Sequence, residues 1–260
     1  MNTRKTVSKH MKIYVINLKR STDRRQRVLD NLGNLKVPFA FFDAIDGRNA
    51  LPDDLEPLLD HNHRKWFRSR PLSPGERGVY ASHFRLWQKC VALNEPIIVM
   101  EDDFLPTEFF TSALTIVPSL IDNGYEYLRL EAQDKGFSPI ESDGSYQTVL
   151  WHDNSKGARA YAISPSGAKK LIDGNRRWLC AVDNQIGESY RTKLVCAGLL
   201  PYAVYNPADF ETTIQTGGKT KVKIIFKLTR ELYRFYRFIR QVIWNQVGLS
   251  QLKKSKTHDS

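Results

Sequence analysis

The chain has 260 residues, 41% of them hydrophobic, and a formal net charge of +11; this length fits one large domain that buries a core. Its three cysteines show no CxxC spacing, which argues against a disulfide framework and suits a reducing cytoplasm. The sequence contains no run that approaches the roughly 20 apolar residues of a membrane-spanning helix. Residues 1–10 are polar and basic without the apolar segment of a secretory signal, so we expect a disordered lead-in.

Strands and helices are predicted to alternate along the first part of the chain. Lys12–Leu18 has the composition of a strand. Ser21 is placed to cap a helix from Thr22 to Leu32, and Gly33 is a natural stop for that helix. Residues 38–44 (Pro-Phe-Ala-Phe-Phe-Asp-Ala) are a second predicted strand, closed by a turn.

A second helix carries a strong start signal. Residues 73–76 (Ser-Pro-Gly-Glu) combine a capping box with proline at the first helical position, and the helix is expected to reach about Asn94. Residues 96–100 (Pro-Ile-Ile-Val-Met) are then typical of a strand buried on both faces. The β-α-β-α-β order predicts an α/β fold with a largely parallel central sheet and right-handed crossovers.

The second half of the chain continues this pattern. Tyr125–Leu130 is predicted as a strand, and Gln147–Trp151 and Ala158–Ser164 as two strands that pair around a turn at residues 153–157. Ser164, followed by proline, predicts the start of a helix that runs through Ile172.

Three carboxylates follow residues 96–100 directly: Glu101, Asp102 and Asp103. Neighbouring acids repel one another and are costly to desolvate, and a divalent cation that also carries a phosphate would offset that cost. Because open α/β sheets bind ligands at the carboxyl ends of their strands, we interpret the triplet as a candidate metal–diphosphate site. The alternative is a strand that runs into an acidic, solvated turn.

Other polar residues also follow predicted strands. Asn17, Arg20 and Arg25 come after the first strand, where guanidinium groups suit phosphate oxygens; the alternative is a solvated basic helix. Asp46-Gly47 closes the second strand. The pair either contacts the ribose or the base of a nucleotide, or it forms an ordinary turn.

Three further residues are weighed singly. His83 lies on the second helix and, taken alone, is more often a structural histidine than a ligand. Asp183 follows a short apolar run, so it is a candidate for a cleft, and Glu131 follows the strand at 125–130. The sequence has no GxGxxG, GxxxxGK[ST] or GxSxG motif, which argues against dinucleotide enzymes, P-loop NTPases and α/β-hydrolases.

Positive charge is concentrated near the C-terminal end. Residues 219–260 carry eleven Lys and Arg against Glu231 and Asp259, a net of +9, which leaves +2 for residues 1–218. The pattern suits a helix on the surface of an anionic membrane; the alternatives are a helix packed on the body with a solvated basic face, and nucleic-acid binding. Residues 217–218 (Gly-Gly) are a predicted hinge. The apolar positions at helical spacing are Ile225, Leu228, Leu232, Phe235, Ile239 and Val242.

Six sequence blocks follow one another along the chain: Tyr14–Ser21 with Asp23–Arg25, Ala44–Gly47, Leu72–Gly78 with Ala81–His83 and Trp87, Ile98–Asp103, Ala160–Ser164 with Gly167-Ala168, and Val182-Asp183. In this order they resemble the blocks of glycosyltransferase family 25, which includes lipooligosaccharide biosynthesis enzymes of Gram-negative bacteria and relatives of the collagen galactosyltransferases. Any one block is weak, whereas six in sequence over about residues 11–215 are specific. Ala181 and Asn184 depart from the family pattern, which often has proline before the Val-Asp pair and an aromatic residue after it.

The resemblance implies a GT-A-like fold over residues 11–216, a nucleotide-sugar donor and an inverting transfer. Glu101 and Asp103, on one face of their strand, would hold Mn²⁺ or Mg²⁺, and Asp102, on the other face, would contact the donor. Asp183 is the candidate base that takes the acceptor's proton, with Glu131 in reserve. The remaining donor-binding residues would be Asn17, Arg20, Arg25, Asp46, Gly47 and His83.

The sequence is therefore interpreted as a cytoplasmic glycosyltransferase, peripheral on the cytoplasmic face of the inner membrane of a Gram-negative bacterium. It would transfer a hexose, galactose from UDP-galactose rather than glucose, in β linkage to a lipid-linked lipooligosaccharide core. Residues 219–260 would bind the anionic membrane surface, and no nucleic-acid partner is expected. Two rival interpretations stay open: a binding or scaffold protein of the same fold without catalysis, and a nucleic-acid-associated protein, suggested by a pI of about 9.5.

Overall fold

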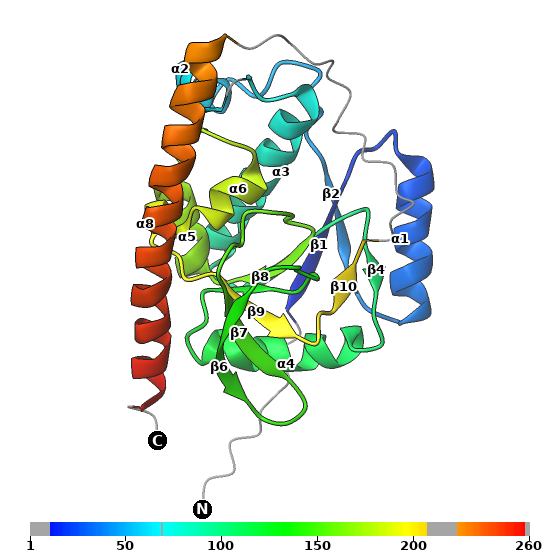
Figure 1. Ribbon diagram of the computed structural model, residues 1–260. Coiled ribbons are helices and arrows are strands. Elements are labelled where there is room, and N and C mark those ends of the chain that lie inside the picture. The colour runs from blue at the N-terminus through cyan, green and yellow to red at the C-terminus, as the bar shows by residue number, and fades with distance from the viewer. Residues whose placement is uncertain (1–10, 69, 207–222, 258–260) are drawn as a thin grey trace, which may run out of the picture.

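The computed structural model describes residues 11–68, 70–206 and 223–257 (Figure 1). An 8-stranded sheet of order β2-β1-β3-β8-β5-β9-β7-β6 forms the centre, and β4 pairs with β10 in a 2-stranded sheet. The strands are β1 (Lys12–Asn17), β2 (Ala40–Asp43), β3 (Ile97–Glu101), β4 (Leu105–Pro106), β5 (Tyr127–Arg129), β6 (Phe137–Ser142), β7 (Gln147–Trp151), β8 (Ala160–Ile163), β9 (Ala197–Leu200) and β10 (Val204–Tyr205). The helices are α1 (Thr22–Asn34), α2 (His61–Phe67), α3 (Pro74–Leu93), α4 (Phe110–Asp122), α5 (Pro165–Asp173), α6 (Val182–Gly187), α7 (Ser189–Thr192) and α8 (Ile224–Thr257), with a short 3-10 turn at Glu56–Leu58.

Most strands of the large sheet run in one direction. β2, β1 and β3 are parallel neighbours, and β5 and β9 form another parallel pair. β8 and β7 run against the others, which makes the sheet mixed. This architecture confirms the predicted α/β class with a mostly parallel central sheet, and it is consistent with a GT-A-like fold.

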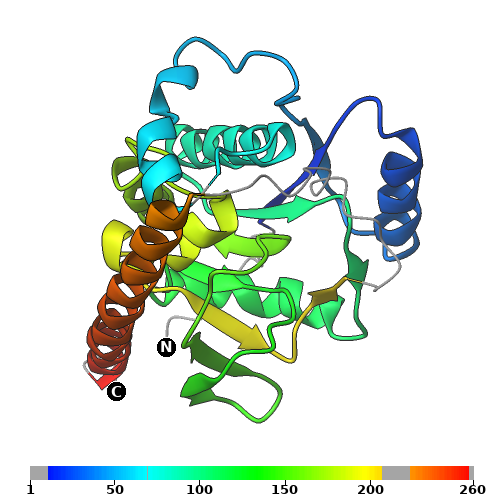
Figure 2. The same cartoon turned by 45° about the horizontal axis from the view of Figure 1, so that its top comes forward.

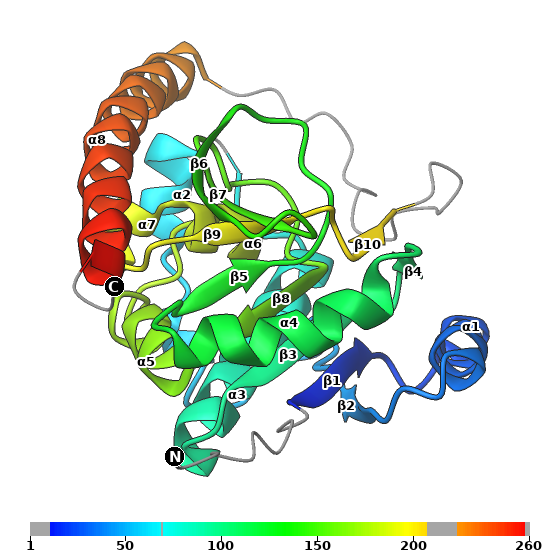
Figure 3. The same ribbon diagram turned by 90° about the horizontal axis from the view of Figure 1, so that it is seen from below.

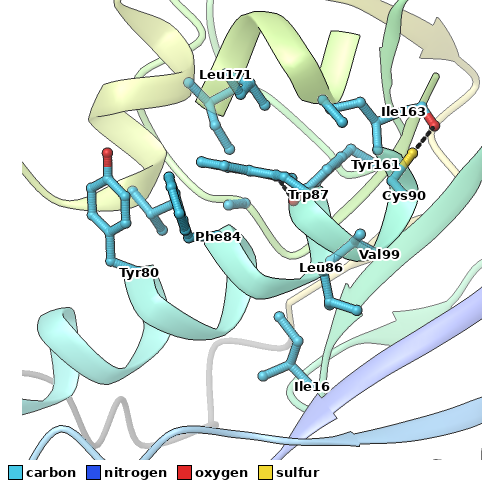
Figure 4. Close-up of a cluster of buried hydrophobic side chains, with 14 of the residues drawn as sticks. Ile16, Tyr80, Phe84, Leu86, Trp87, Cys90, Val99, Tyr161, Ile163 and Leu171 are labelled. Atoms are coloured by element: carbon cyan, nitrogen blue, oxygen red, sulfur yellow. Dashed lines mark hydrogen bonds between the residues drawn. The ribbon is translucent and has the colours of Figure 1, made fainter. Parts of the chain in front are cut away.

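The central strands separate two hydrophobic cores. In β3, Ile97 and Val99 face one core, and Ile98 and Met100 face the other, because side chains alternate along a strand. α3 and α5 cover the first core, which includes Trp87 (Figure 4), and α1 and α4 cover the second. Figures 2 and 3 show α3 and α4 on opposite faces of the sheet. β3 is thus buried on both faces, as predicted, and this holds the acids at its end in place.

Two of the three predicted serine caps are present, at α3 and α5. The Glu76 N–H donates to Ser73 Oγ at 3.2 Å, and the Ser73 N–H donates to Glu76 Oε2 at 2.7 Å, which forms a capping box at α3. At α5, the Ser164 hydroxyl accepts a hydrogen bond from the Gly167 N–H at 3.1 Å. These local motifs set where the two helices begin.

α1 begins at Thr22 as predicted, but the predicted cap by the Ser21 side chain and the predicted stop at Gly33 were wrong. The Ser21 side chain caps no N–H of the described chain, and its carbonyl instead accepts a hydrogen bond from Asn17 Nδ2 at 3.5 Å. α1 continues through Gly33, and the chain turns away at Lys36, where φ is 53°. A glycine ends a helix when its own backbone enters the left-handed region. Here Lys36, and not Gly33, adopts that conformation.

The predicted pairing of β7 with β8 was also wrong. β7 lies between β9 and β6, whereas β8 lies between β3 and β5. The Asp143 N–H donates to the Tyr146 carbonyl at 3.3 Å in the turn that joins β6 to β7, so β6 is the hairpin partner of β7. The prediction treated the next strand in the sequence as the next strand in the sheet.

The basic C-terminal segment forms α8, a helix of 34 residues along the outside of the body (Figures 1 and 3). α8 contacts α2 and α7, so it packs on the body. None of the helices in the described residues is both long and apolar enough to cross a bilayer. The predicted lead-in at 1–10 and the hinge at 217–218 lie outside the described residues.

Candidate active site

Charged residues gather where β1, β3 and β5 end and β8 begins. β3 is parallel to β1 and antiparallel to β8, so the end of β3 lies between Asn17 and Arg159. The Glu101 N–H donates to the Arg159 carbonyl at 2.8 Å, and Glu131 follows β5, the strand next to β8. The topology therefore brings the acid triplet and Glu131 to one edge of the sheet, where α/β proteins bind ligands.

Arg159 joins Asp103 to Glu131. Its Nε donates to Asp103 Oδ1 at 2.9 Å, and its Nη1 donates to Glu131 Oε2 at 2.8 Å. All three side chains are largely buried, so their charges interact with little screening by water. This cluster links one predicted metal ligand to the reserve base.

Glu131 is almost completely buried between two arginines. Arg129 Nη2 donates to its Oε1 at 2.8 Å, and Arg159 Nη1 donates to its Oε2. Burial raises the pKa of Glu131 to about 7, against the opposing effect of the Arg129 and Arg159 guanidinium groups. Both carboxylate oxygens are therefore used to hold arginines.

Asp183 lies next to the same cluster. Its Oδ2 accepts a hydrogen bond from the Gly157 N–H at 3.3 Å. A Cβ at Gly157, where φ is 76°, would lie 2.7 Å from Glu131 Oε2. Gly157 thus separates the two carboxylates predicted as bases. Asp183 is partly exposed and Glu131 is not, so Asp183 is the more accessible of the two.

A chain of buried hydrogen bonds ends at Glu101. His83 Nε2 lies 3.2 Å from Glu101 Oε1, and His83 Nδ1 lies 2.9 Å from the Tyr161 hydroxyl. Trp87 Nε1 donates to that hydroxyl at 2.8 Å; Figure 4 shows Trp87 and Tyr161. An ionised carboxylate only accepts, so Nε2 carries the hydrogen; in a neutral ring, Nδ1 then accepts from the Tyr161 O–H. His83 is fully buried behind Glu101, with both ring nitrogens engaged. His83 therefore contacts Glu101, a carboxylate of the candidate site, directly.

Asp102 and Asp103 point toward opposite neighbours. β3 ends at Glu101, so the strand alternation used to place Glu101 and Asp103 on one face does not extend past that residue. Asp102 accepts hydrogen bonds from Asn17 Nδ2 at 2.7 Å and from Arg24 Nη1 at 3.0 Å. Asp102 is thus held toward β1 and α1, whereas Asp103 is held toward β8.

Among the other predicted donor-binding side chains, Arg20 and Asp46 pair at the loop after β2, whereas Arg25 contacts Asn17 at the end of β1 and Phe41 of β2. Arg20 and Arg48 both bind Asp46, and hydrogen bonds from Arg48 are the main cause that lowers the pKa of Asp46 to about 2. The Arg25 guanidinium lies 3.8 Å from the centre of the Phe41 ring. These side chains have protein partners, and none of them touches the Arg159 cluster through a contact that the structure describes.

Gly47 lies where this loop crosses α3. A Cβ at Gly47 would lie 2.0 Å from the Pro74 carbonyl oxygen and 2.5 Å from the Gly78 nitrogen. The Ile45 N–H donates to Ser82 Oγ at 2.9 Å beside this crossing. The backbones approach too closely for a side chain, which gives Gly47 a packing role.

The carboxylates at the end of β3 match the chemistry of the predicted metal. Glu101 and Asp103 are hard oxygen ligands, which Mn²⁺ and Mg²⁺ take together with water and phosphate oxygens. Within the described residues, no three His, Cys, Asp or Glu side chains converge into a metal-binding group, and Asp103 is paired with Arg159. The described residues thus form no ready-made metal-binding group, and the metal stays a prediction that rests on the oxygen ligands of Glu101 and Asp103.

The sequence interpretation missed Arg129 and Arg159. Arg129 lies two residues before Glu131, a spacing that places both side chains on one face of a strand and was visible in the sequence. Arg159 is separated by 56 positions from Asp103. Only the antiparallel register of β3 and β8 brings that pair together.

The chain resembles known proteins over most of its length. The profile of "Glycosyltransferase family 25 (LPS biosynthesis protein)" matches residues 10–186. A "Glycosyltransferase 25 family member" of Aedes aegypti is 31% identical over 175 residues, which cover 62% of this chain and 28% of that protein. Procollagen galactosyltransferase 2 of Homo sapiens is 29% identical over 181 residues, which cover 63% and 27%. Lipooligosaccharide biosynthesis protein lic2B of Haemophilus influenzae is 24% identical over 213 residues, which cover 77% and 73%.

The matched region contains the whole cluster described above, from Asn17 to Asp183. The chain spans less than a third of the length of the mosquito and human relatives. The family profile, in contrast, covers well over half of this chain. The chain belongs to glycosyltransferase family 25.

Proposed function

We propose that this protein is an inverting glycosyltransferase that moves a hexose, galactose rather than glucose, from a UDP-sugar to a lipooligosaccharide core in β linkage. Family membership supports glycosyl transfer, and the names of two relatives, a procollagen galactosyltransferase and a lipooligosaccharide biosynthesis protein, support the sugar and the acceptor. The observation that carries the proposal is the cluster of carboxylates and arginines at the carboxyl ends of β3 and β5.

The donor's diphosphate would lie at the end of β3. Glu101 and Asp103 would hold Mn²⁺ or Mg²⁺ there, and an ion so held stabilises the negative charge of the departing UDP. Arg159, which is already fixed by Glu131 at 2.8 Å, would present a second positive charge to the same phosphates. The hydrogen bond from His83 would keep the Glu101 carboxylate in one orientation.

Asp183 would act as the base. The acceptor hydroxyl oxygen forms a bond to the anomeric carbon while the bond from that carbon to UDP breaks. UDP leaves with the bonding electrons, the Asp183 carboxylate takes the hydroxyl proton, and attack opposite UDP inverts the anomeric centre. The partial exposure of Asp183 supports this role. The burial of Glu131 supports a different one, which is to position Arg129 and Arg159.

The acceptor would be lipid-linked, and the reaction would take place at the cytoplasmic face of the inner membrane of a Gram-negative bacterium. The name of the Haemophilus relative supports this acceptor class.

Release of UDP tests the proposal. The full chain with UDP-galactose, Mn²⁺ and truncated lipooligosaccharide should release UDP faster than with UDP-glucose, and NMR of the product should show a β linkage. Asp183→Asn should lower kcat by about 100-fold or more, because a general base contributes at least about that factor. Asp173→Asn removes an acid of an exposed ion pair on α5 and should leave kcat unchanged. Absence of turnover with every nucleotide sugar would contradict the proposal.

The alternative is a sugar-nucleotide-binding protein of the same fold without catalysis. It is favoured by one observation: Asp103 is already paired with Arg159, and a cation would have to compete for this carboxylate. Such a protein would bind UDP-galactose in calorimetry and release no UDP, so the two measurements together separate the two functions.

A further inference from the structure

The face of α8 that points away from the body is apolar. We call its side chains the outer stripe; they are 40–65% exposed and recur at spacings of one to four residues along the helix. The stripe consists of Ile225, Leu228, Leu232, Phe235, Phe238, Ile239, Val242 and Ile243. A continuous run of exposed aliphatic and aromatic side chains on one helix face indicates an interaction surface.

The opposite face of α8 makes the contacts with the body. Tyr233 packs on His63 and Phe67 of α2, with ring centres 5.1 and 5.0 Å apart. Further along, Gln241 Nε2 donates to Ser189 Oγ at 2.9 Å, and further still Asn245 Nδ2 donates to the His152 carbonyl at 2.9 Å. Successive contacts at helical spacing show that α8 is docked through its polar and aromatic face. The outer stripe therefore faces solvent.

A buried ion cluster fixes this docking. Glu188 is bound by Arg68 of the segment after α2, by Arg191 of α7 at 3.2 Å, and by Arg237 of α8 at 2.9 Å. Burial would raise the pKa of Glu188, but the three guanidinium groups outweigh it and hold the pKa below its usual value. Glu188 thus stays ionised at neutral pH and holds one face of α8 inward.

Cationic side chains border the outer stripe. Lys223, Lys227, Arg234 and Arg240 are exposed, and the acid within this helical segment, Glu231, is paired with Arg234 at 2.8 Å. The apolar face of such a helix matches the acyl region of a bilayer, and the cations along its border match anionic lipid headgroups.

We propose that the outer stripe of α8 binds the surface of an anionic lipid bilayer, with α8 lying in the plane of the membrane while its inner face stays docked on the body. At about 1.5 Å per residue, its 34 residues extend about 50 Å along that plane. A second copy of the chain is the less favoured occupant, because two copies of this positively charged helix would repel each other. The inference goes beyond the proposed function, because binding to a membrane requires no turnover.

Vesicle binding by the full chain tests the inference. The protein should sediment with vesicles of phosphatidylglycerol and phosphatidylcholine far more than with phosphatidylcholine alone, and 0.5 M salt should weaken this binding. Leu232→Ser/Phe235→Ser should weaken it by about tenfold or more, because both side chains would lose burial in the lipid interface. Leu29→Ser/Leu93→Ser, which removes exposed apolar side chains from α1 and α3, should bind as the wild type does.

A fluorescent label tests the orientation of α8. Cys90, Cys180 and Cys196 are buried, so a single introduced thiol can be labelled selectively. A polarity-sensitive dye on Phe238→Cys should shift its emission to shorter wavelength when anionic vesicles are added. The same dye on Ser145→Cys, in the exposed turn between β6 and β7, should show no shift.

Three outcomes would overturn the inference. They are equal binding to neutral and anionic vesicles, undiminished binding of the outer-stripe variant, and a dimer in light scattering that the stripe variant abolishes while vesicles are not bound. Release of UDP with a detergent-solubilised acceptor is measured separately on the wild type and the stripe variant. Turnover without vesicle binding would leave the proposed function standing and reject only this inference.

Discussion

Burial, opposed by Arg129 and Arg159, determines the pKa of Glu131 at the scale of single residues. Burial disfavours the charged carboxylate, and two guanidinium groups favour it, with burial prevailing. The pKa of Glu131 in the folded chain is therefore raised to about 7. In the unfolded chain its pKa returns to 4.5. Between these two values, folding is linked to the uptake of a proton.

This linkage predicts a pH dependence of stability. Because the folded state holds the extra proton, the contribution of Glu131 to the free energy of unfolding should fall as pH rises from about 4.5 to about 7. Glu131→Gln should lack this contribution, so the stability difference between wild type and variant should change across that window. Urea unfolding at four pH values measures it. Glu126→Gln, in a partly exposed pair with Lys170, should keep the wild-type slope; a Glu131→Gln curve parallel to wild type would refute the assignment.

The Tyr161 hydroxyl links Trp87 to His83, and its removal should be costly. Tyr161→Phe leaves Trp87 Nε1 and His83 Nδ1 without this partner in the core, so we expect the free energy of unfolding to fall by about 1–3 kcal/mol. Donor affinity should also fall, because His83 holds Glu101.

Tyr80 offers a matched control for Tyr161→Phe. Tyr80 is fully buried in the same core (Figure 4), but its hydroxyl has no hydrogen-bond partner among the described residues. Tyr80→Phe should therefore leave both stability and donor affinity near their wild-type values. Equal effects of the two substitutions, measured by urea unfolding and calorimetry, would argue against a specific role for the hydrogen-bond chain.

At the scale of elements, α3 and α1 begin with the same residue type but in different ways. Ser73 takes part in a capping box, whereas the Ser21 side chain caps nothing in the described chain. Ser73→Ala should lower the free energy of unfolding by about 1 kcal/mol, and Ser21→Ala should lower it by only a few tenths. Urea unfolding of the two variants makes the comparison, and equal losses would show that the serine of α3 does not act as a cap.

The elements also show what local sequence predicts and what it does not. The capping motifs of α3 and α5 and the apolar run of β3 involve neighbouring residues, so they were predicted correctly. Strand pairing depends on register across the sheet, and this is why the partners of β7 and β8 were missed. The same holds for the candidate site. The acids Glu101–Asp103 follow one predicted strand, so the sequence predicted their position, whereas Arg159 reaches them only through the pairing of β3 with β8.

At the scale of the whole molecule, binding of the donor should be measurable as stability. A ligand that binds only the folded state raises the melting temperature. UDP-galactose with Mn²⁺ should therefore raise Tm more than either alone, and Asp103→Asn should remove most of the Mn²⁺-dependent part. A Tm that responds to UDP-galactose but not to Mn²⁺ would contradict the metal assignment, and no response to any UDP-sugar would contradict the donor assignment.

The crossing of Gly47 and Gly78 has a consequence for the site. Gly78 belongs to α3, the helix that also carries His83, and a Cβ there would lie 2.4 Å from the Ile45 carbonyl oxygen. A single methyl group at either glycine would therefore push α3 away from the loop after β2. The imidazole would move with the helix and change its distance from Glu101. A substitution at Gly47 or Gly78, neither of which would contact the substrate, would then alter the charge that Glu101 presents to the substrate. The substitutions that this crossing tolerates should therefore depend on catalysis as well as on folding.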